Sequence, residues 1–312
     1  MEGPQWLEER RKGIGGSDVA AILGLSPFKT AFQVYQEKRR EIESWEGNET
    51  TDWGKRMEPA IRQWYSDTTG RAVRLPDKIL YNPQYPFMLA SIDGFTDDPR
   101  GVEIKTARSP KGWGEPRTNE IPDYYAVQVH HYMIVTAFPV FDVAVSIGGG
   151  HPVLYEVEAD KEISDMIIDT EEAFWKRVQD GNPPDPVTYS DAVARFGKIK
   201  CTGAIRAGAG ILRGVNLLHE IRNKKAELEE AEEQIKKELI SFLGESADTL
   251  IDSSGNTILT YKLSAGRKLF DSKTLKKDHP EIYQQYLKTS EPSRRLLLKQ
   301  RRIEYGITAS NI

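Results

Sequence analysis

The sequence predicts a mixed α/β fold followed by a C-terminal extension. Across residues 1–195, apolar residues recur first with the helical period and then with the strand period. The run 182–186 contains three prolines, which cannot continue a helix, so a boundary is expected there. We therefore predict a first domain over 1–195, a long charged helical segment over 196–248 and a small basic α+β region over 249–312.

Capping residues and apolar stripes define the elements of the first domain. Ser17 and Gly24 have the residue types that begin and end a short helix. Met57, Ile61 and Trp64 recur at helical spacing before a glycine stop at Gly70. The predicted helices are 18–24, 30–40, 51–70, 124–136 and 161–181. The predicted strands are 78–81, 87–95, 102–106, 140–147 and 153–157.

The second part begins with one long helix, predicted over 210–244. Ile221, Leu228, Ile235 and Phe242 recur every seven residues, but lysine and glutamate interrupt the companion apolar row. This pattern favours one helix packing against a partner surface over a full coiled coil. Strands over 249–252 and 257–263, a helix over 271–288 and a strand over 295–299 are expected to follow.

Composition restricts the class of protein. Of 312 residues, 38% are hydrophobic, which is enough for at least one substantial core. The single cysteine, Cys201, excludes an internal disulfide framework and fits a reducing compartment. The N-terminus lacks a basic segment followed by an apolar one, and no run of about 18 apolar residues occurs. We expect a cytoplasmic protein that does not interact with membranes.

Charge is distributed unevenly along the chain. The net charge is -4, yet residues 262–302 contain twelve Lys and Arg against four Asp and Glu. A basic end on an acidic body is an electrostatic pattern suited to DNA, although a solvated tail would give the same count. The charge pattern leaves both interpretations open.

The strongest chemical signal is Asp93 followed by Glu103 and Lys105. Side chains alternate along a strand, so Glu103 and Lys105 point the same way, and a hairpin brings Asp93 beside Glu103. Two adjacent carboxylates are costly to bury unless a cation accompanies them, and oxygen ligands suit Mg²⁺. With a cation and a lysine, such a site has the parts that phosphodiester hydrolysis needs. On spacing alone, an exposed hairpin with a salt bridge is the better explanation of the pattern.

Three neighbouring features favour a catalytic site over that simple hairpin. Glu58, on the helix over 51–70, is a third carboxylate that can reach it. Gln128 and Tyr132 lie four residues apart, on one side of the helix over 124–136. Three basic residues at 10–12 precede glycines and Ser17, an arrangement that suits a phosphate group.

Taken in order, these segments resemble the lambda-exonuclease-like family of phage recombinases, and most closely its YqaJ branch. The resemblance runs from about residue 6 to residue 175. It rests on the motifs at Arg10–Gly24, Gly54–Glu58, Tyr85–Asp93, Glu103–Ala107 and Gln128–Met133.

The resemblance implies a PD-(D/E)xK restriction-endonuclease-like core, in which a central mixed sheet is flanked by helices. It also implies Mg²⁺-dependent 5′-to-3′ digestion of double-stranded DNA ends, with Mn²⁺ as a substitute. Carried over by position, Asp93, Glu103 and the Ile104 carbonyl bind the metal, and Glu58 assists there. Lys105 activates the attacking water, and Gln128 supports it. Arg10 and Ser17 hold the 5′-phosphate, although the spacing leaves Arg11 as an alternative to Arg10. Tyr132 and His130 are further candidates for DNA contact; adjacent His130 and His131 point in different directions and do not form a zinc site.

The family also implies partners that composition and spacing do not reveal. These are a single-strand annealing protein that loads onto the exposed 3′ strand, and further copies of the chain in a ring-shaped trimer. The expected setting is a bacterial host cell, with a phage or prophage origin. Two alternatives remain: a PD-(D/E)xK endonuclease of resolvase or restriction type, and a non-catalytic DNA-binding recombination scaffold.

Overall fold

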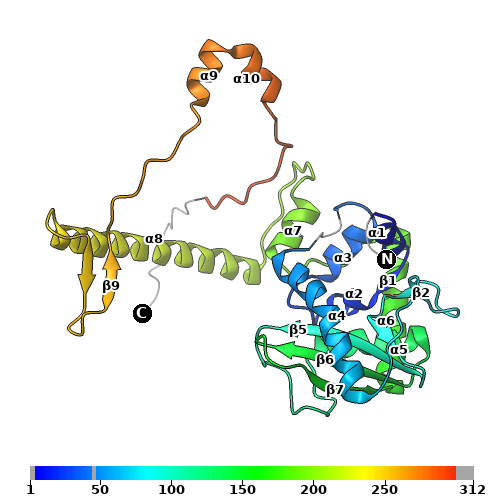
Figure 1. Cartoon of the computed structure of the whole chain (residues 1–312). Coiled ribbons are helices and arrows are strands. Elements are labelled where there is room, and N and C mark those ends of the chain that lie inside the picture. The colour runs from blue at the N-terminus through cyan, green and yellow to red at the C-terminus, as the bar shows by residue number, and fades with distance from the viewer. Residues whose placement is uncertain (1–3, 44–46, 300–312) are drawn as a thin grey trace, which may run out of the picture. The chain divides into compact units, whose positions relative to one another are not determined.

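A computed structural model describes residues 4–43 and 47–299 of the chain. The chain divides into two compact units, Met1–Arg195 and Phe196–Ile312 (Figure 1). Within the described residues, every helix is too short or too polar to cross a lipid bilayer.

A four-stranded sheet forms the centre of the first unit. Its strands lie in the order β4 (Gly94–Phe95), β5 (Arg100–Ala107), β6 (Val140–Ile147) and β7 (Val153–Glu158). β5 and β6 are parallel, whereas the two outer pairs are antiparallel. The mixed strand directions confirm the predicted fold class.

A second, three-stranded sheet has the order β1 (Ile14–Gly15), β3 (Met88–Ala90) and β2 (Leu80–Tyr81). The single strand predicted over 87–95 is therefore wrong, because the chain leaves one sheet after Ala90 and enters the other at Gly94. Asp93 lies in the break between these sheets. This break frees the Asp93 backbone from both ladders.

Helices α4 (Glu49–Thr69) and α5 (Asp123–Thr136) cover opposite faces of the four-stranded sheet (Figure 1). Ile61 and Tyr65 of α4 pack in one cluster with Val102, Ile104 and Ala144 of the sheet. Residues of α5 join the larger core, which contains the alternate side chains Phe141, Val143 and Val145 of β6. Because β5 pairs in register with β6, Glu103 and Lys105 share the face of Val143 and Val145, toward α5.

The remaining helices of this unit are α1 (Pro4–Arg11), α2 (Gly16–Ile22), α3 (Ala31–Lys38), α6 (Lys161–Asp180) and α7 (Tyr189–Phe196). Neither α1 nor α7 was predicted. The expected helix cap at Ser17 is also wrong, because Gly15 occupies the N-cap position of α2. Asp18 instead reaches back to accept a hydrogen bond from the Gly15 N–H at 3.2 Å.

The second unit begins with the 35-residue helix α8 (Ala209–Leu243). An antiparallel hairpin, β8 (Thr249–Ile251) and β9 (Thr257–Thr260), follows it, and then helices α9 (Ser272–Asp278) and α10 (Pro280–Tyr286). The single helix predicted over 271–288 is divided at Pro280, and the strand predicted over 295–299 does not form. Among the described residues of this unit, Leu243 is the only buried apolar side chain.

Candidate active site

Asp93 and Glu103 face each other at the edge of the four-stranded sheet. Gly94 pairs with Val102 in the antiparallel β4–β5 ladder, so the preceding residue, Asp93, falls opposite Glu103. The Asp93 Oδ2 accepts a hydrogen bond from the Ile104 N–H at 2.8 Å, in the place of a strand partner. The N–H and C=O of one strand residue point to the same edge, so the Ile104 carbonyl also points toward Asp93.

Lys105 and Gln128 complete a hydrogen-bonded network around Glu103. The Lys105 Nζ lies 2.5 Å from the Glu103 Oε1 and donates to the Gln128 Oε1 at 3.3 Å. The Gln128 amide donates to the Glu103 Oε1 at 2.9 Å and to the Tyr132 hydroxyl at 3.0 Å. The fold thus brings together the residues predicted from β5 with those predicted from α5.

Tyr125 belongs to this network and was not predicted. The Lys105 Nζ lies 4.7 Å from the centre of the Tyr125 ring, within the range of a cation–π interaction. Tyr125 precedes Gln128 by three residues, so both lie on one side of α5. That spacing is the sequence signal that could have identified it.

The two carboxylates are strongly perturbed. Burial, followed by repulsion from Glu103, raises the pKa of Asp93 to about 7. Burial also raises the pKa of Glu103, although the Lys105 ammonium opposes that shift. The Glu103 Oε2 is buried without a hydrogen-bond partner. The pair therefore carries more negative potential than Lys105 alone neutralises.

Glu58 and Arg62 lie at the margin of the pair. Glu58, on α4, raises the pKa of Glu103 through charge repulsion, whereas Arg62 lowers that of Asp93. Arg62 also forms a salt bridge with Glu58 one helical turn away. Glu58 is thus close enough to act on the pair electrostatically.

The residues present fit a hard divalent cation. In the described part of the chain, no cluster of three or more His, Cys, Asp or Glu side chains is arranged to hold a metal ion. Asp93 and Glu103 nevertheless offer two carboxylates beside the Ile104 carbonyl, all oxygen donors of the type that Mg²⁺ prefers. The unpartnered Glu103 Oε2 and the raised pKa of Asp93 are both features that a nearby cation would relieve.

The structure distinguishes between the two arginines proposed for phosphate binding. The Arg10 guanidinium donates to the Ser17 Oγ at 2.6 Å and lies 4.8 Å from the centre of the Trp6 ring. Arg11 instead forms a salt bridge with Glu8 at 2.8 Å. Only Arg10 is therefore placed beside Ser17.

Gly16 brings the Arg10–Ser17 pair close to the carboxylate network. A Cβ atom on Gly16 would lie 2.4 Å from the Tyr132 Cε1 and 3.1 Å from the Gln128 Cγ. Only glycine permits this approach of α2 to α5. As a result, Ser17 follows directly after the point where α2 contacts the Gln128–Tyr132 side of α5.

A buried charge cluster, which was not predicted from the sequence, holds the backbone of Arg10 in place. The Lys38 Nζ lies 2.7 Å from the Asp18 Oδ2 and donates to the Arg10 carbonyl oxygen at 2.8 Å. Burial alone would raise the pKa of Asp18, but Lys38, Lys29 and Arg10 hold it well below its usual range. Lys38 therefore links the end of α1 to α2.

The two histidines of α5 do not belong to this site. His130 is 4% exposed, as is Tyr132, and burial lowers the pKa of His130, so the contact of its ring with DNA stays a prediction. His131 is fully buried between the Glu171 carboxylate, 2.7 Å from its Nδ1, and the Leu89 carbonyl, 2.8 Å from its Nε2. Both rings are buried inside the first unit.

Comparisons with known proteins place the chain in the family that the motifs resemble. Residues 5–139 match the family described as the YqaJ-like viral recombinase domain. This range contains every candidate residue of the site. The chain is 31% identical over 303 residues to the protein YqaJ of Bacillus subtilis (strain 168), itself described as uncharacterized, and the match covers 92% of each chain.

Two solved structures are similar to part of the chain. An alkaline exonuclease (LHK-Exo) from Laribacter hongkongensis is 20% identical, covers 57% of this chain and 93% of its own, and gives a TM-score of 0.47. A phage related exonuclease from Haemophilus somnus 129PT is 13% identical, covers 54% of this chain and 94% of its own, and gives a TM-score of 0.42.

Proposed function

This chain belongs to the YqaJ-like viral recombinase family, and from that premise we propose that it is a metal-dependent nuclease that digests double-stranded DNA from its 5′ ends. The observation that carries the proposal is the buried pair Asp93 and Glu103 beside Lys105. Two buried carboxylates destabilise the fold unless a bound cation offsets them, and evolution retains such a cost mainly at functional sites.

Each residue of the network has a chemical role in this proposal. Asp93, Glu103 and the Ile104 carbonyl would hold Mg²⁺, for which Mn²⁺ is a substitute, and Glu58 would assist at the margin. When bound, the metal supplies Lewis-acid polarisation of the scissile phosphate and favours deprotonation of water. The Lys105 ammonium orients the attacking water and stabilises the negative charge that develops at phosphorus. Gln128 fixes the orientation of Lys105 and Glu103 through its amide.

The Arg10–Ser17 pair gives the proposed preference for ends. A guanidinium can donate two parallel hydrogen bonds to a phosphate, and the Ser17 hydroxyl adds another donor. Both groups are at least partly accessible to solvent. Since Gly16 places them next to Tyr132 and Gln128, a terminal 5′-phosphate held there would leave a nearby phosphodiester within reach of Lys105.

The proposal is tested with matched DNA substrates in the presence of Mg²⁺. Linear duplex with a 5′-phosphate should be consumed, covalently closed circles should survive, and Asp93→Ala or Lys105→Ala should abolish digestion. Cleavage of closed circles would instead favour a PD-(D/E)xK endonuclease, and absence of all cleavage a non-catalytic recombination scaffold. Arg10→Ala should reduce the preference for a 5′-phosphate over a 5′-hydroxyl, whereas Arg11→Ala, the matched control, should not.

The family description supports a role for the products as well. Digestion from the 5′ end leaves a 3′ single strand, which we propose is passed to a single-strand annealing protein during phage-type recombination in a bacterial host. A homo-oligomer, such as a ring that encloses the DNA, belongs to the same proposal. Strand-specific end labels test the polarity: a 5′ label should be released before a 3′ label.

A further inference from the structure

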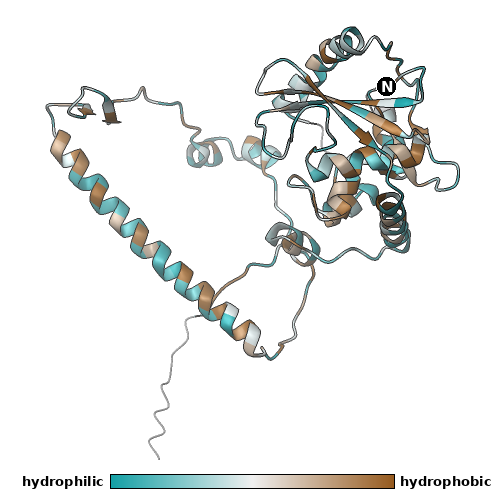
Figure 2. Cartoon of the chain, turned by 90° about the horizontal axis from the view of Figure 1, so that it is seen from below, coloured by the Kyte–Doolittle hydropathy of each residue, from teal (hydrophilic) through white to brown (hydrophobic). Residues whose placement is uncertain are grey.

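Helix α8 carries an apolar seam that the second unit leaves exposed. Residues at alternating three- and four-residue spacing form one row, which we call the α8 seam. Its members are Ile211, Gly214, Leu218, Ile221, Lys225, Leu228, Glu232, Ile235, Leu239 and Phe242. The exposed fractions are 53% for Ile221, 71% for Leu228, 56% for Ile235 and 76% for Phe242. Figure 2 shows hydrophobic residues recurring along the whole helix.

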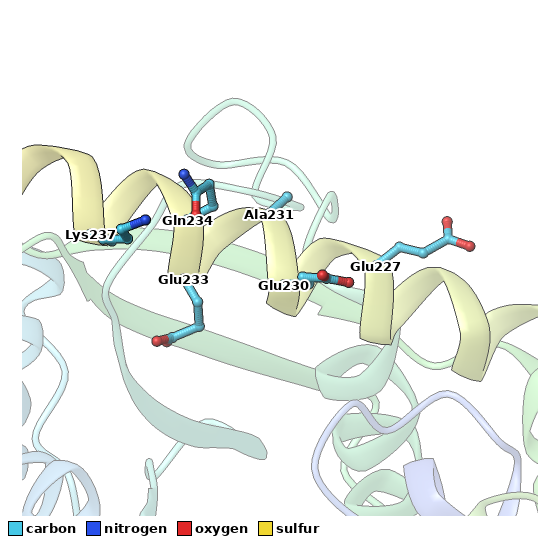
Figure 3. Close-up of a pocket in the computed structure, with 6 residues that line it drawn as sticks. All are labelled: Glu227, Glu230, Ala231, Glu233, Gln234 and Lys237. Carbon is cyan, nitrogen blue, oxygen red and sulfur yellow. The ribbon is translucent and has the colours of Figure 1, made fainter.

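The opposite side of α8 is polar. Glu227, Glu230, Glu233, Gln234 and Lys237 line a shallow surface hollow that this one helix forms by itself (Figure 3). Their side chains suit water, and no second element contributes to the hollow. The apolar side of α8 is therefore the side suited to a partner.

We propose that the α8 seam pairs antiparallel with the α8 seam of a second copy of this chain. The two charged interruptions decide the direction. In a parallel pair, Lys225 would meet Lys225 and Glu232 would meet Glu232, so like charges would face each other in both layers. In the antiparallel register that follows, Lys225 faces Leu228 and Glu232 faces Ile221 of the second copy, so no layer contains two charged residues.

One antiparallel register places the remaining apolar residues of the two seams opposite each other. Placing Leu228 against Lys225 of the second copy also places Ile235 against Leu218, and Phe242 against Ile211. The flanking residues Arg222 and Glu229 then lie across from each other, again with opposite charge. Because Ile211 and Phe242 lie near the two ends of α8 (Ala209–Leu243), the helices overlap over almost their full length. This register therefore pairs the apolar ends of the two seams and keeps like charges out of a shared layer.

The first experiment measures the mass of the full chain in solution by light scattering or sedimentation. Leu228→Asp should lower the mass of the particle, and should halve it where α8 pairing is the only contact between copies. Glu233→Lys, on the polar side of α8, is the matched control and should leave the mass unchanged. Lys225→Glu and Glu232→Lys should each weaken the assembly, and the two together should restore it. A wild-type mass that Leu228→Asp does not change would overturn the proposal, and would indicate that another part of the chain or a foreign helix covers the seam.

A crosslinking experiment tests the direction without relying on a destabilised variant. In a Cys201→Ser background, Ile211→Cys and Phe242→Cys chains are prepared separately and oxidised alone or mixed. An antiparallel pair should crosslink only in the mixture, because two thiols introduced at position 242 would be about 46 Å apart at 1.5 Å per residue. Crosslinking of Phe242→Cys chains alone would overturn the antiparallel arrangement. Nuclease activity is not needed for either readout, so the proposal stands or fails separately from the proposed function.

Discussion

The Lys105 ammonium lies 2.5 Å from the Glu103 carboxylate, and the two side chains are 17% and 3% exposed. Lys105 thus offsets part of the charge of Glu103 and Asp93 in the metal-free protein. The carboxylates in turn act on Lys105: burial alone would lower its pKa, but Glu103 and Asp93 outweigh burial and raise it. Lys105 therefore stays protonated at neutral pH and suits the role of a fixed cation rather than a general base.

Replacing Lys105 should affect both stability and activity. Lys105→Met leaves Glu103 and Asp93 buried without their nearest cation, which typically destabilises a protein by about 3–5 kcal/mol. Hydrolysis should fall by at least about 10²-fold, as for removal of one transition-state donor. Urea unfolding without metal and DNA digestion with Mg²⁺ measure the two effects. Lys161→Met, at an exposed lysine on α6, is the control, and equal behaviour of the two variants would contradict the assigned role of Lys105.

Metal binding should depend on pH through Asp93. Its pKa in the folded protein is raised to about 7 from an ordinary value near 3.8, so the folded state binds an extra proton between these values. Without metal, this group therefore costs stability as the pH rises through that window. Binding of Mn²⁺ requires the ionised form, so affinity should increase up to about pH 7 and then level off. Calorimetric titration of Mn²⁺ measures this, and an affinity that is flat between pH 5 and 7 would argue against Asp93 as a ligand.

The contact between Gly16 and Tyr132 should control end recognition. In Gly16→Ala, the new methyl group would have to displace the Tyr132 ring, which typically costs about 1–3 kcal/mol. The preference for a 5′-phosphate should fall because Ser17 moves away from α5. Gly24→Ala, at a glycine with open space around it but a positive φ of 74°, controls for a general loss of stability. If Gly16→Ala kept the preference for a 5′-phosphate over a 5′-hydroxyl, the contact of Gly16 with Tyr132 would have no role in recognising the DNA end.

Lys38 should act as a positioning residue for Arg10. Lys38→Met removes the donor that binds the Arg10 carbonyl and the nearest cation of Asp18. We expect a higher KM for 5′-phosphorylated DNA, with little change in the rate on DNA that carries a 5′-hydroxyl. A purely structural role would lower both rates together. Lys12→Met, at an exposed lysine paired with Glu9, is the matched control.

The His131–Glu171 pair should make the first unit less stable at alkaline pH. The Leu89 carbonyl can only accept, so the His131 Nε2 carries one proton, and a second lies between the Nδ1 and Glu171. Burial opposes the charge of His131 and favours the neutral form of Glu171, yet the pKa values of both groups are raised. Because both pKa values are raised, the folded pair retains a proton that the unfolded chain releases.

The sign of the pH effect follows from this retained proton. The stabilisation should be present below about pH 6.5, the ordinary histidine value, and be lost as the pH rises through the folded-state value. All six tryptophans precede residue 176, so tryptophan fluorescence during urea unfolding reports the first unit alone. His131→Gln should flatten the dependence on pH, whereas His151→Gln, at an exposed histidine, should not. A flat wild-type profile would show that the folded pair releases this proton at the same pH as the unfolded chain, and would contradict the retained proton.

The sequence by itself determined the residue types, the alternation on β5 and the order of the motifs. Those patterns were sufficient to predict the mixed α/β class, the long helix α8 and the grouping of Glu103 with Lys105, because period and turn chemistry are local properties. The motif order also gave the family. Helix α1 has no apolar stripe and gave no usable signal, whereas α7 begins with a capping pair, Thr188 and Asp191, that could have identified it.

Only the tertiary structure decided which residues meet. The break after Ala90 places Asp93 against the Ile104 N–H, and no local pattern reveals that one apolar run serves two sheets. Arg10 and Lys38, or His131 and Glu171, come together through helix packing between segments far apart in the chain. Burial, and with it the direction of each pKa shift, depends on all the neighbours that surround a group. Such neighbours are fixed by the packed core rather than by spacing along the chain.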